Sequence, residues 1–144
     1  MVAAAPVDRI AAESDVVVRF GFNLLTGRVL SEPEYRVLRF HPGDVRRYRG
    51  LSPARMFLNC ERTAGVALQQ LTDEFDAGNV VLTESTDVAD ARTLDGIQRR
   101  LNELKVEMLP AGVERPREPD AELSPPESLA DYVSVKECRS RGRY

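Results

Sequence analysis

The sequence is poor in the residues that metal centres and disulfide scaffolds require, with one histidine and two cysteines among 144 residues. Cys60 and Cys138 lie far apart and outside any metal-binding spacing, so we expect two reduced thiols in a cytoplasmic protein and no metal site. No apolar run approaches the ~20 residues of a membrane helix, and the first six residues lack the basic region of a signal peptide. A glycine-rich phosphate loop and a Ser/His/Asp order are also missing.

The charge balance gives no reason to expect a nucleic-acid or membrane partner. Twenty basic residues against 23 acidic residues leave a formal net charge of −3, with 42% hydrophobic and 30% charged residues. These fractions are typical of globular proteins, and the length leaves room for one domain. A weakly acidic domain of this kind is expected to bind neither nucleic acid nor a lipid surface.

Short apolar segments that alternate with loops predict an α/β fold within residues 1–113. The alternating segment 35–41 places Arg39 and His41 on one face of a strand, and Pro42 is expected to end that strand. The predicted strands are residues 15–20, 35–41, 64–71 and 79–84.

Two helices are expected between and after these strands. Ser52 and Pro53 are typical of an N-cap followed by the first helical residue. This helix would end near Cys60, with Met56, Phe57 and Cys60 inward. Apolar residues spaced by three and four predict a second amphipathic helix, which Pro110 would terminate. Its stripe consists of Leu94, Ile97, Leu101, Leu104 and Met108.

The composition changes near residue 113. Four of the nine prolines fall in residues 114–144, which we expect to form a Pro-rich extended C-terminal tail. Apolar residues near its end could dock as a short strand or turn, and these are Leu129, Tyr132, Val133 and Val135.

Two residues and one loop are candidates for chemistry. His41 lies at the carboxyl end of a predicted strand, where ligand crevices form in open α/β sheets, and Asp76 lies in a tight turn between two strands. Together they could supply a general acid/base and its orienting carboxylate, although either could instead be structural. The basic loop 46–49 could hold an anion or could be solvated.

Two linked motifs resemble the formyltransferase family, which includes methionyl-tRNA formyltransferase and phosphoribosylglycinamide formyltransferase. Residues 40–50 read FHPGDVRRYRG, residues 64–66 read AGV, and residues 73–78 read DEFDAG. The family pattern is Asn-x-His-Pro-Ser, an Arg-Tyr-Arg-Gly-like loop, a Thr-Gly-Val-like strand and Asp-Glu-x-Asp-x-Gly. Order and separations match over roughly residues 16–109.

The resemblance implies formyl transfer from 10-formyltetrahydrofolate to an amine acceptor. His41 would be the general acid/base, Asp76 would orient it, and Arg39 occupies the position of the family's asparagine, which stabilises the oxyanion. The resemblance also implies a folate-binding set, namely Gly21, Phe22, Asn23, Leu24, Leu25 and Asp73. The implied substrate-binding set is Arg47, Tyr48, Arg49 and Gly50.

For the fold, the resemblance implies the C-terminal portion of a Rossmann-like mixed sheet with flanking helices, formed by residues 1–113 without the family's N-terminal half. The strand at Val16–Val18 would then lie exposed at a sheet edge, so we expect self-association or pairing with a separate N-terminal polypeptide. Two alternatives to the transferase stay open. One is a catalytically impaired folate- or partner-binding remnant, and the other is a formyl-folate hydrolase.

Overall fold

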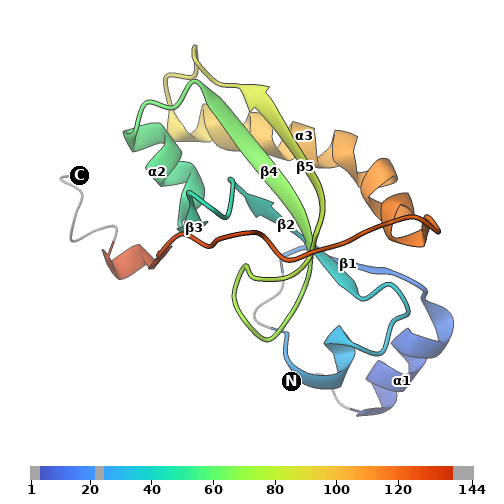
Figure 1. Ribbon diagram of the computed structural model, residues 1–144. Helices are drawn as coiled ribbons and strands as arrows, with labels where there is room; N and C mark the ends of the chain where they lie inside the picture. Colours follow the sequence, from blue (N-terminus) through green and yellow to red (C-terminus); the bar gives the residue numbers. More distant parts are fainter. Residues whose placement is uncertain (1–3, 22–24, 138–144) are drawn as a thin grey trace.

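The centre of the molecule is a four-stranded sheet in the order β1–β2–β4–β5 (Figure 1). The structure is a computed structural model that describes residues 4–21 and 25–137. β1 runs parallel to β2, whereas β4 is antiparallel to both β2 and β5, so the sheet is mixed. The strands are β1 (Val17–Arg19), β2 (Val37–Pro42), β4 (Thr63–Gln70) and β5 (Val80–Asp87).

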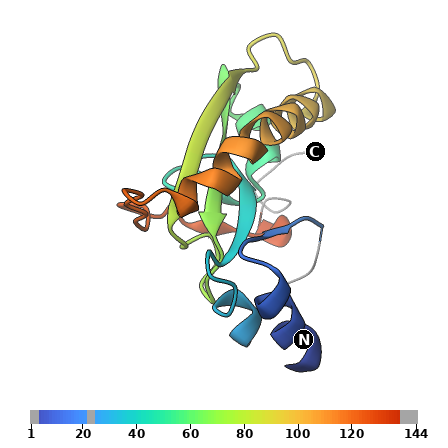
Figure 2. The same cartoon turned by 90° about the vertical axis from the view of Figure 1, so that its right-hand side faces the viewer.

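The main core lies between this sheet and the long helix α3 (Leu94–Glu114), which packs across β4 and β5 (Figure 2). The predicted stripe is confirmed, because four of its five residues are buried: Ile97, Leu101, Leu104 and Met108. Thr93 caps the helix, since its hydroxyl accepts a hydrogen bond from the backbone N–H of Gly96.

The alternation predicted for β2 is also confirmed. Leu38 and Phe40 are buried in the main core with α3. Arg39 and His41 face the opposite side of the sheet, where both contact Asp76. The α/β prediction, with a mixed sheet and flanking helices, therefore holds.

A second, smaller core lies at the β1 end of the sheet, between helix α1 (Ala4–Glu13) and the 3-10 helix η1 (Gly27–Leu30). Its buried residues are Val7, Val29, Leu30 and Val37. β1 stands at the edge of the sheet and its three residues are half-buried.

The prediction that Pro110 ends the long helix is wrong, because α3 continues to Glu114 with Pro110 inside it. Proline removes one helical hydrogen bond, the one to the carbonyl of Val106, but Val106 is 72% exposed and water can solvate that carbonyl. The last turn is held by packing, since a Cβ on Gly112 would lie 2.2 Å from Leu68 Cδ2. Tertiary contact thus outweighs the local cost of the proline.

Helix α2 (Ser52–Leu58) differs from its prediction at both ends. Leu51 rather than Ser52 is the N-cap, and the Ser52 hydroxyl turns back to donate to the carbonyl of Gly50. At the other end Cys60 is exposed, not inward, because it adopts a left-handed conformation (φ 52°) in the turn that ends the helix. Cys138 lies outside the described residues.

The C-terminal segment returns along the sheet after α3 and the 3-10 helix η2 (Arg115–Arg117) (Figure 1). Ser124 bridges to Val80, and β6 (Tyr132–Val133) then pairs in parallel with β3 (Arg49–Gly50). The docking expected for Tyr132 and Val133 as a short strand is therefore observed. No described helix is long and apolar enough to cross a membrane.

Candidate active site

The turn between β4 and β5 is built to hold Asp76 in one place. Asp76 adopts a left-handed backbone (φ 58°), which aspartate tolerates better than most residues. The buried Gln69 side chain donates hydrogen bonds to the carbonyls of Asp76 and Gly78, at 3.1 Å each. A Cβ on Gly78 would lie 1.6 Å from the carbonyl oxygen of Gln70, so only glycine fits there.

The Asp76 carboxylate contacts two side chains from β2, those of Arg39 and His41. The contact with His41 is the one that the family resemblance implied. One carboxylate oxygen, Oδ1, lies 2.7 Å from Arg39 Nη1 and 3.2 Å from His41 Nδ1. The side chains of Asp76 and His41 are 3% and 1% exposed, and that of Arg39 is 22% exposed. The sequence-predicted histidine and aspartate, more than thirty residues apart, therefore meet at one buried point.

The second ring nitrogen of His41 also faces an oxygen. Nε2 lies 2.8 Å from the backbone carbonyl of Tyr48, with the Ser52 hydroxyl at 3.4 Å. A carbonyl and a carboxylate can only accept hydrogen bonds, so each ring nitrogen of His41 faces an acceptor. His41 is thus clamped from both sides and fully buried.

The environment of Asp76 favours its ionised form. Burial alone would raise the pKa of Asp76, but the hydrogen bond and charge of His41, the charge of Arg39 and the backbone N–H of Gly50 lower it to about 2. Asp76 is therefore a carboxylate at neutral pH, able to accept hydrogen bonds but a weak proton acceptor.

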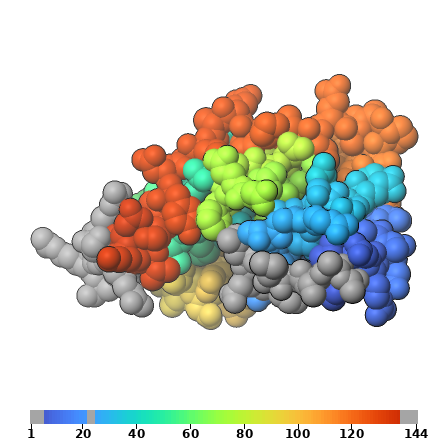
Figure 3. All heavy atoms as spheres, turned by 90° about the horizontal axis from the view of Figure 1, so that it is seen from below, coloured from blue at the N-terminus to red at the C-terminus, as the bar shows by residue number. Residues whose placement is uncertain are grey.

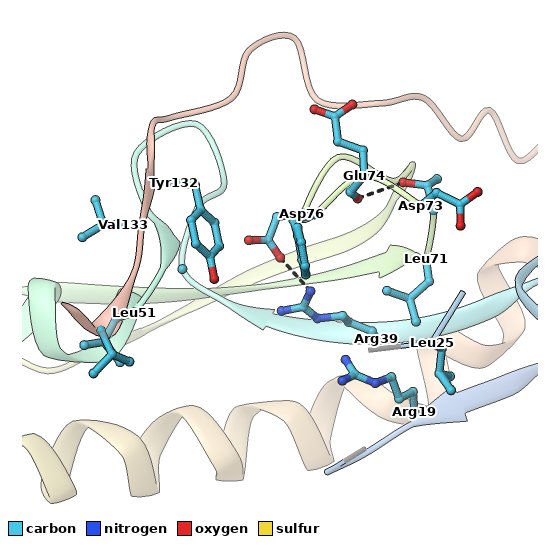
Figure 4. Close-up of a pocket in the computed structure, with 14 residues that line it drawn as sticks. Arg19, Leu25, Arg39, Leu51, Leu71, Asp73, Glu74, Asp76, Tyr132 and Val133 are labelled. Carbon is cyan, nitrogen blue, oxygen red and sulfur yellow. Dashed lines mark hydrogen bonds and ion pairs between the residues drawn. The ribbon is translucent and has the colours of Figure 1, made fainter. Parts of the chain in front are cut away.

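A hollow of about 340 Å³ opens beside this cluster (Figure 4). Arg39 and Asp76 line it, whereas His41 is not among its lining residues and lies behind them. Figure 4 shows Leu25 and Leu71 toward one end of the hollow and Leu51 and Val133 toward the other. The turn residues 72–75, Tyr132 and Val135 complete the apolar and polar lining. The carboxylate and the guanidinium stand between the two ends.

Only some of the predicted folate-binding residues line the hollow. Leu25 and Asp73 line the hollow, and Gly21, with φ 64°, does not. Phe22, Asn23 and Leu24 lie outside the described residues. Within the described parts of the chain, no group of three His, Cys, Asp or Glu side chains is placed to hold a metal ion.

Of the predicted substrate-binding residues, only Gly50 reaches this hollow. Arg47 pairs with Glu61 at 2.6 Å, and the Tyr48 hydroxyl donates to the same carboxylate. Arg49 donates to backbone carbonyls instead of facing the hollow. The side chains of Arg47, Tyr48 and Arg49 therefore do not line the hollow, although the Tyr48 carbonyl contacts His41.

The basic loop does not converge on an anion either. Arg46 is bound by Asp44 at 2.8 Å, and the neighbouring guanidinium groups of Arg47 and Arg49 have the separate partners just described. Each arginine in the loop 46–49 thus donates to a different acceptor group within this chain.

Sequence reasoning missed Arg19 and the tail residues Tyr132 and Val133, which line the hollow. Burial lowers the pKa of Arg19, and the charge of Arg39 lowers it further, so the two guanidinium groups are neighbours. The available signal for Arg19 was that it is the only charged residue in the apolar run 16–20. No sequence signal indicated which side of the sheet the tail would return to.

Comparisons with known proteins agree with the motifs and the fold. The family model described as "Formyl transferase" matches residues 3–113. The methionyl-tRNA formyltransferase of Thermotoga maritima is 33% identical over 124 residues, which cover 84% of this chain and 40% of that protein. The chain thus spans less than half the length of this relative.

Two solved structures share the fold at lower identity. HypX from Aquifex aeolicus in complex with tetrahydrofolic acid superposes with a TM-score of 0.69 at 23% identity, covering 94% of this chain and 24% of that one. Glycinamide ribonucleotide transformylase 1 from Symbiobacterium toebii gives a TM-score of 0.69 at 21% identity, covering 89% and 62%. With the family model spanning most of its length, this chain belongs to the formyl transferase family.

Proposed function

We propose that this chain catalyses transfer of a formyl group from a reduced folate, 10-formyltetrahydrofolate, to an amine acceptor. The observation that carries the proposal is the buried cluster in which Asp76 Oδ1 contacts both Arg39 and His41 beside an open hollow. Membership of the family and the tetrahydrofolic acid named for the HypX structure support a folate donor. The relatives named above differ in acceptor, so the acceptor is left as an amine.

The hollow fits the reactive end of such a donor. Its volume of about 340 Å³ lies in the range of small-molecule sites. Leu25 and Leu71 offer apolar surface for a flat heterocycle at one end, next to the polar turn that carries Asp73. The acceptor would then enter from the other end, past Gly50 and Tyr132.

The reaction forms a bond between the amine nitrogen and the formyl carbon, breaks the bond from that carbon to the folate nitrogen, and moves one proton from the amine to that nitrogen. Arg39, whose guanidinium reaches the hollow, donates hydrogen bonds to the formyl oxygen as negative charge develops on it. Asp76, ionised at neutral pH, accepts a hydrogen bond from the attacking amine and stabilises the positive charge that develops there.

His41 acts through Asp76 in this proposal. Because it is fully buried and absent from the lining of the hollow, it is a positioning residue in the observed geometry rather than a group that touches the substrate. Its contact with Oδ1 fixes the carboxylate and helps to keep it ionised.

The test is consumption of 10-formyltetrahydrofolate by the wild-type chain and by His41→Ala, with and without a panel of amines. The panel would hold glycinamide ribonucleotide, methionyl-tRNA and an amino-sugar nucleotide. Consumption that requires an amine and is lost in His41→Ala supports the transferase. Consumption without any amine would favour a hydrolase, and folate binding without turnover would favour a binding remnant.

We propose further that the chain pairs through β1, either with a second copy or with a separate N-terminal polypeptide. β1 ends the sheet within the described part of the chain, and an edge strand offers unpaired backbone groups to a partner. Size-exclusion chromatography should then show a species larger than a monomer. A monomer that unfolds cooperatively would contradict this proposal.

A further inference from the structure

Arg49 joins two segments that lie far from it in the sequence. Its Nη2 donates to the carbonyl of Phe75 at 2.6 Å, and its Nη1 donates to the carbonyl of Ala130 at 3.1 Å. Phe75 directly precedes Asp76, and Ala130 lies just before β6. A guanidinium donates in a rigid planar fork, so a lysine cannot make both bonds with the same geometry.

The backbone around Arg49 holds the C-terminal segment by further contacts. Ala130 N donates to Val45 O at 2.9 Å, and Leu51 N donates to Val133 O at 3.1 Å. The chain passes so close at Gly50 that a Cβ there would lie 2.1 Å from the carbonyl oxygen of Val133. A side chain at position 50 would therefore push β6 away.

The C-terminal segment also touches the Asp76 turn through side chains. The rings of Phe75 and Tyr132 lie 5.8 Å apart between centroids, and each residue is about half exposed. Seen from below, the tail and the loop that follows β4 lie side by side (Figure 3). Tyr132 and Val133 line the same hollow as Asp76, so the tail forms one wall of the candidate active site (Figure 4).

We propose that Arg49 is a positioning residue that couples the docking of the tail segment 130–133 to the placement of Asp76. The turn is held on one side by Gln69, which donates to the carbonyl of Asp76. Arg49 holds it on the other side through the carbonyl of Phe75. Releasing Arg49 frees one side of the turn and lets Asp76 move relative to His41.

The experiment uses the fact that His41 is the only histidine. Its ring resonances report its contact with Asp76 directly by NMR, whether or not the chain is active. The variants are Arg49→Lys, which keeps the charge but not the fork, and Tyr132→Ala, which keeps Arg49 but removes the ring that packs on Phe75. Arg46→Lys is the matched control, because the Arg46 side chain pairs with Asp44, whereas the carbonyls of Phe75 and Ala130 are bound by Arg49.

We expect the His41 ring resonances to shift in both Arg49→Lys and Tyr132→Ala while the methyl resonances of the main core stay in place. In Arg46→Lys the His41 resonances should stay unchanged. Unshifted His41 resonances in folded Arg49→Lys, or an equal shift in the control, would overturn the proposal. Should Arg49→Lys fail to fold, the His41 resonances of Tyr132→Ala decide by the same criterion.

The catalytic consequence rests on the proposed function and is measured separately. Displacing a reacting group by about 1 Å costs on the order of 100-fold in rate, so Arg49→Lys should lower kcat by about 10- to 100-fold with little change in the KM for the folate donor. A raised KM for the donor at unchanged kcat would instead mean that Arg49 binds substrate. A wild-type chain without formyl transfer would refute the proposed function and leave the NMR result standing.

Discussion

The charged face of β2 and the basic loop that follows it both carry arginines, but the side chains on β2 share one carboxylate and those in the loop bind separate groups. On β2, Arg39 and His41 share one carboxylate oxygen in a buried site. In the loop, Arg46 and Arg47 each take a different carboxylate at the surface. Charges on one buried strand face converge because the alternation of the strand aligns them, whereas exposed loop charges pair with whichever acceptor is nearest.

Removing the shared carboxylate should break the β2 cluster most severely. Asp76→Asn keeps the shape of the side chain but removes the charge that holds Arg39 and His41. We expect a loss of about 100- to 1000-fold in the rate of formyl transfer, the scale associated with losing one electrostatic group at a reacting centre. Steady-state kinetics with a saturating folate donor measure this loss. Activity within a factor of three of wild type would remove Asp76 from the reaction.

Changing the guanidinium tests the other half of the cluster. Arg39→Ala removes the donor proposed for the formyl oxygen, and kcat should fall by about 100-fold with the fold intact. Arg39→Asn restores a neutral donor at the family's usual position and should recover part of the rate. If Arg39→Asn is active and the wild type is not, Arg39 blocks the site rather than serving it.

The low pKa of Asp76 predicts a particular loss of stability in acid. Its pKa is about 2 in the folded chain against an ordinary value of 3.8, so the unfolded chain binds more protons between these values. Stability from this group is complete above about pH 4 and is lost as the pH falls through about 2, for a total of about 2 kcal/mol. Urea unfolding of wild type and Asp76→Asn from pH 5 to pH 2 measures it. The free energies of unfolding of wild type and Asp76→Asn should converge by this amount as the pH falls. A difference that stays constant would contradict the lowered pKa of Asp76.

The surface loop should give the smallest effect. Arg47→Gln removes an ion pair whose arginine side chain is 63% exposed, and such pairs contribute about 0 to 1 kcal/mol. We expect an unfolding free energy within about 0.5 kcal/mol of wild type and an unchanged kcat. A kcat lowered tenfold would show that the loop acts on the substrate after all, and the contrast between the two regions would fail.

Local patterns predicted the parts of the fold that depend on local order. The alternation of β2 placed Leu38 and Phe40 on one face and Arg39 and His41 on the other, as the structure has them. The linked motifs implied that Asp76 orients His41, and the two side chains do meet. These features follow from strand periodicity and from motif spacing, which the sequence displays directly.

The rest depends on contacts between distant segments, which no local pattern encodes. Pro110 remains helical because Gly112 packs on Leu68, a residue more than forty positions away. Arg49 donates to the carbonyls of Phe75 and Ala130, contacts that no local pattern around Arg49 predicts. Ser52 left its expected capping role because the Gly50 carbonyl and His41 lie beside it.

We propose that Asp76, held between Arg39 and His41, supports transfer of a formyl group to an amine. The most direct measurement follows formyl-labelled 10-formyltetrahydrofolate into an amine product, with wild type and Asp76→Asn side by side. We expect the wild type to form the labelled formamide, and we expect the yield of this product to be lower by about 100-fold or more with Asp76→Asn. Equal product from both chains, or label released as formate whether or not an amine is present, would contradict it.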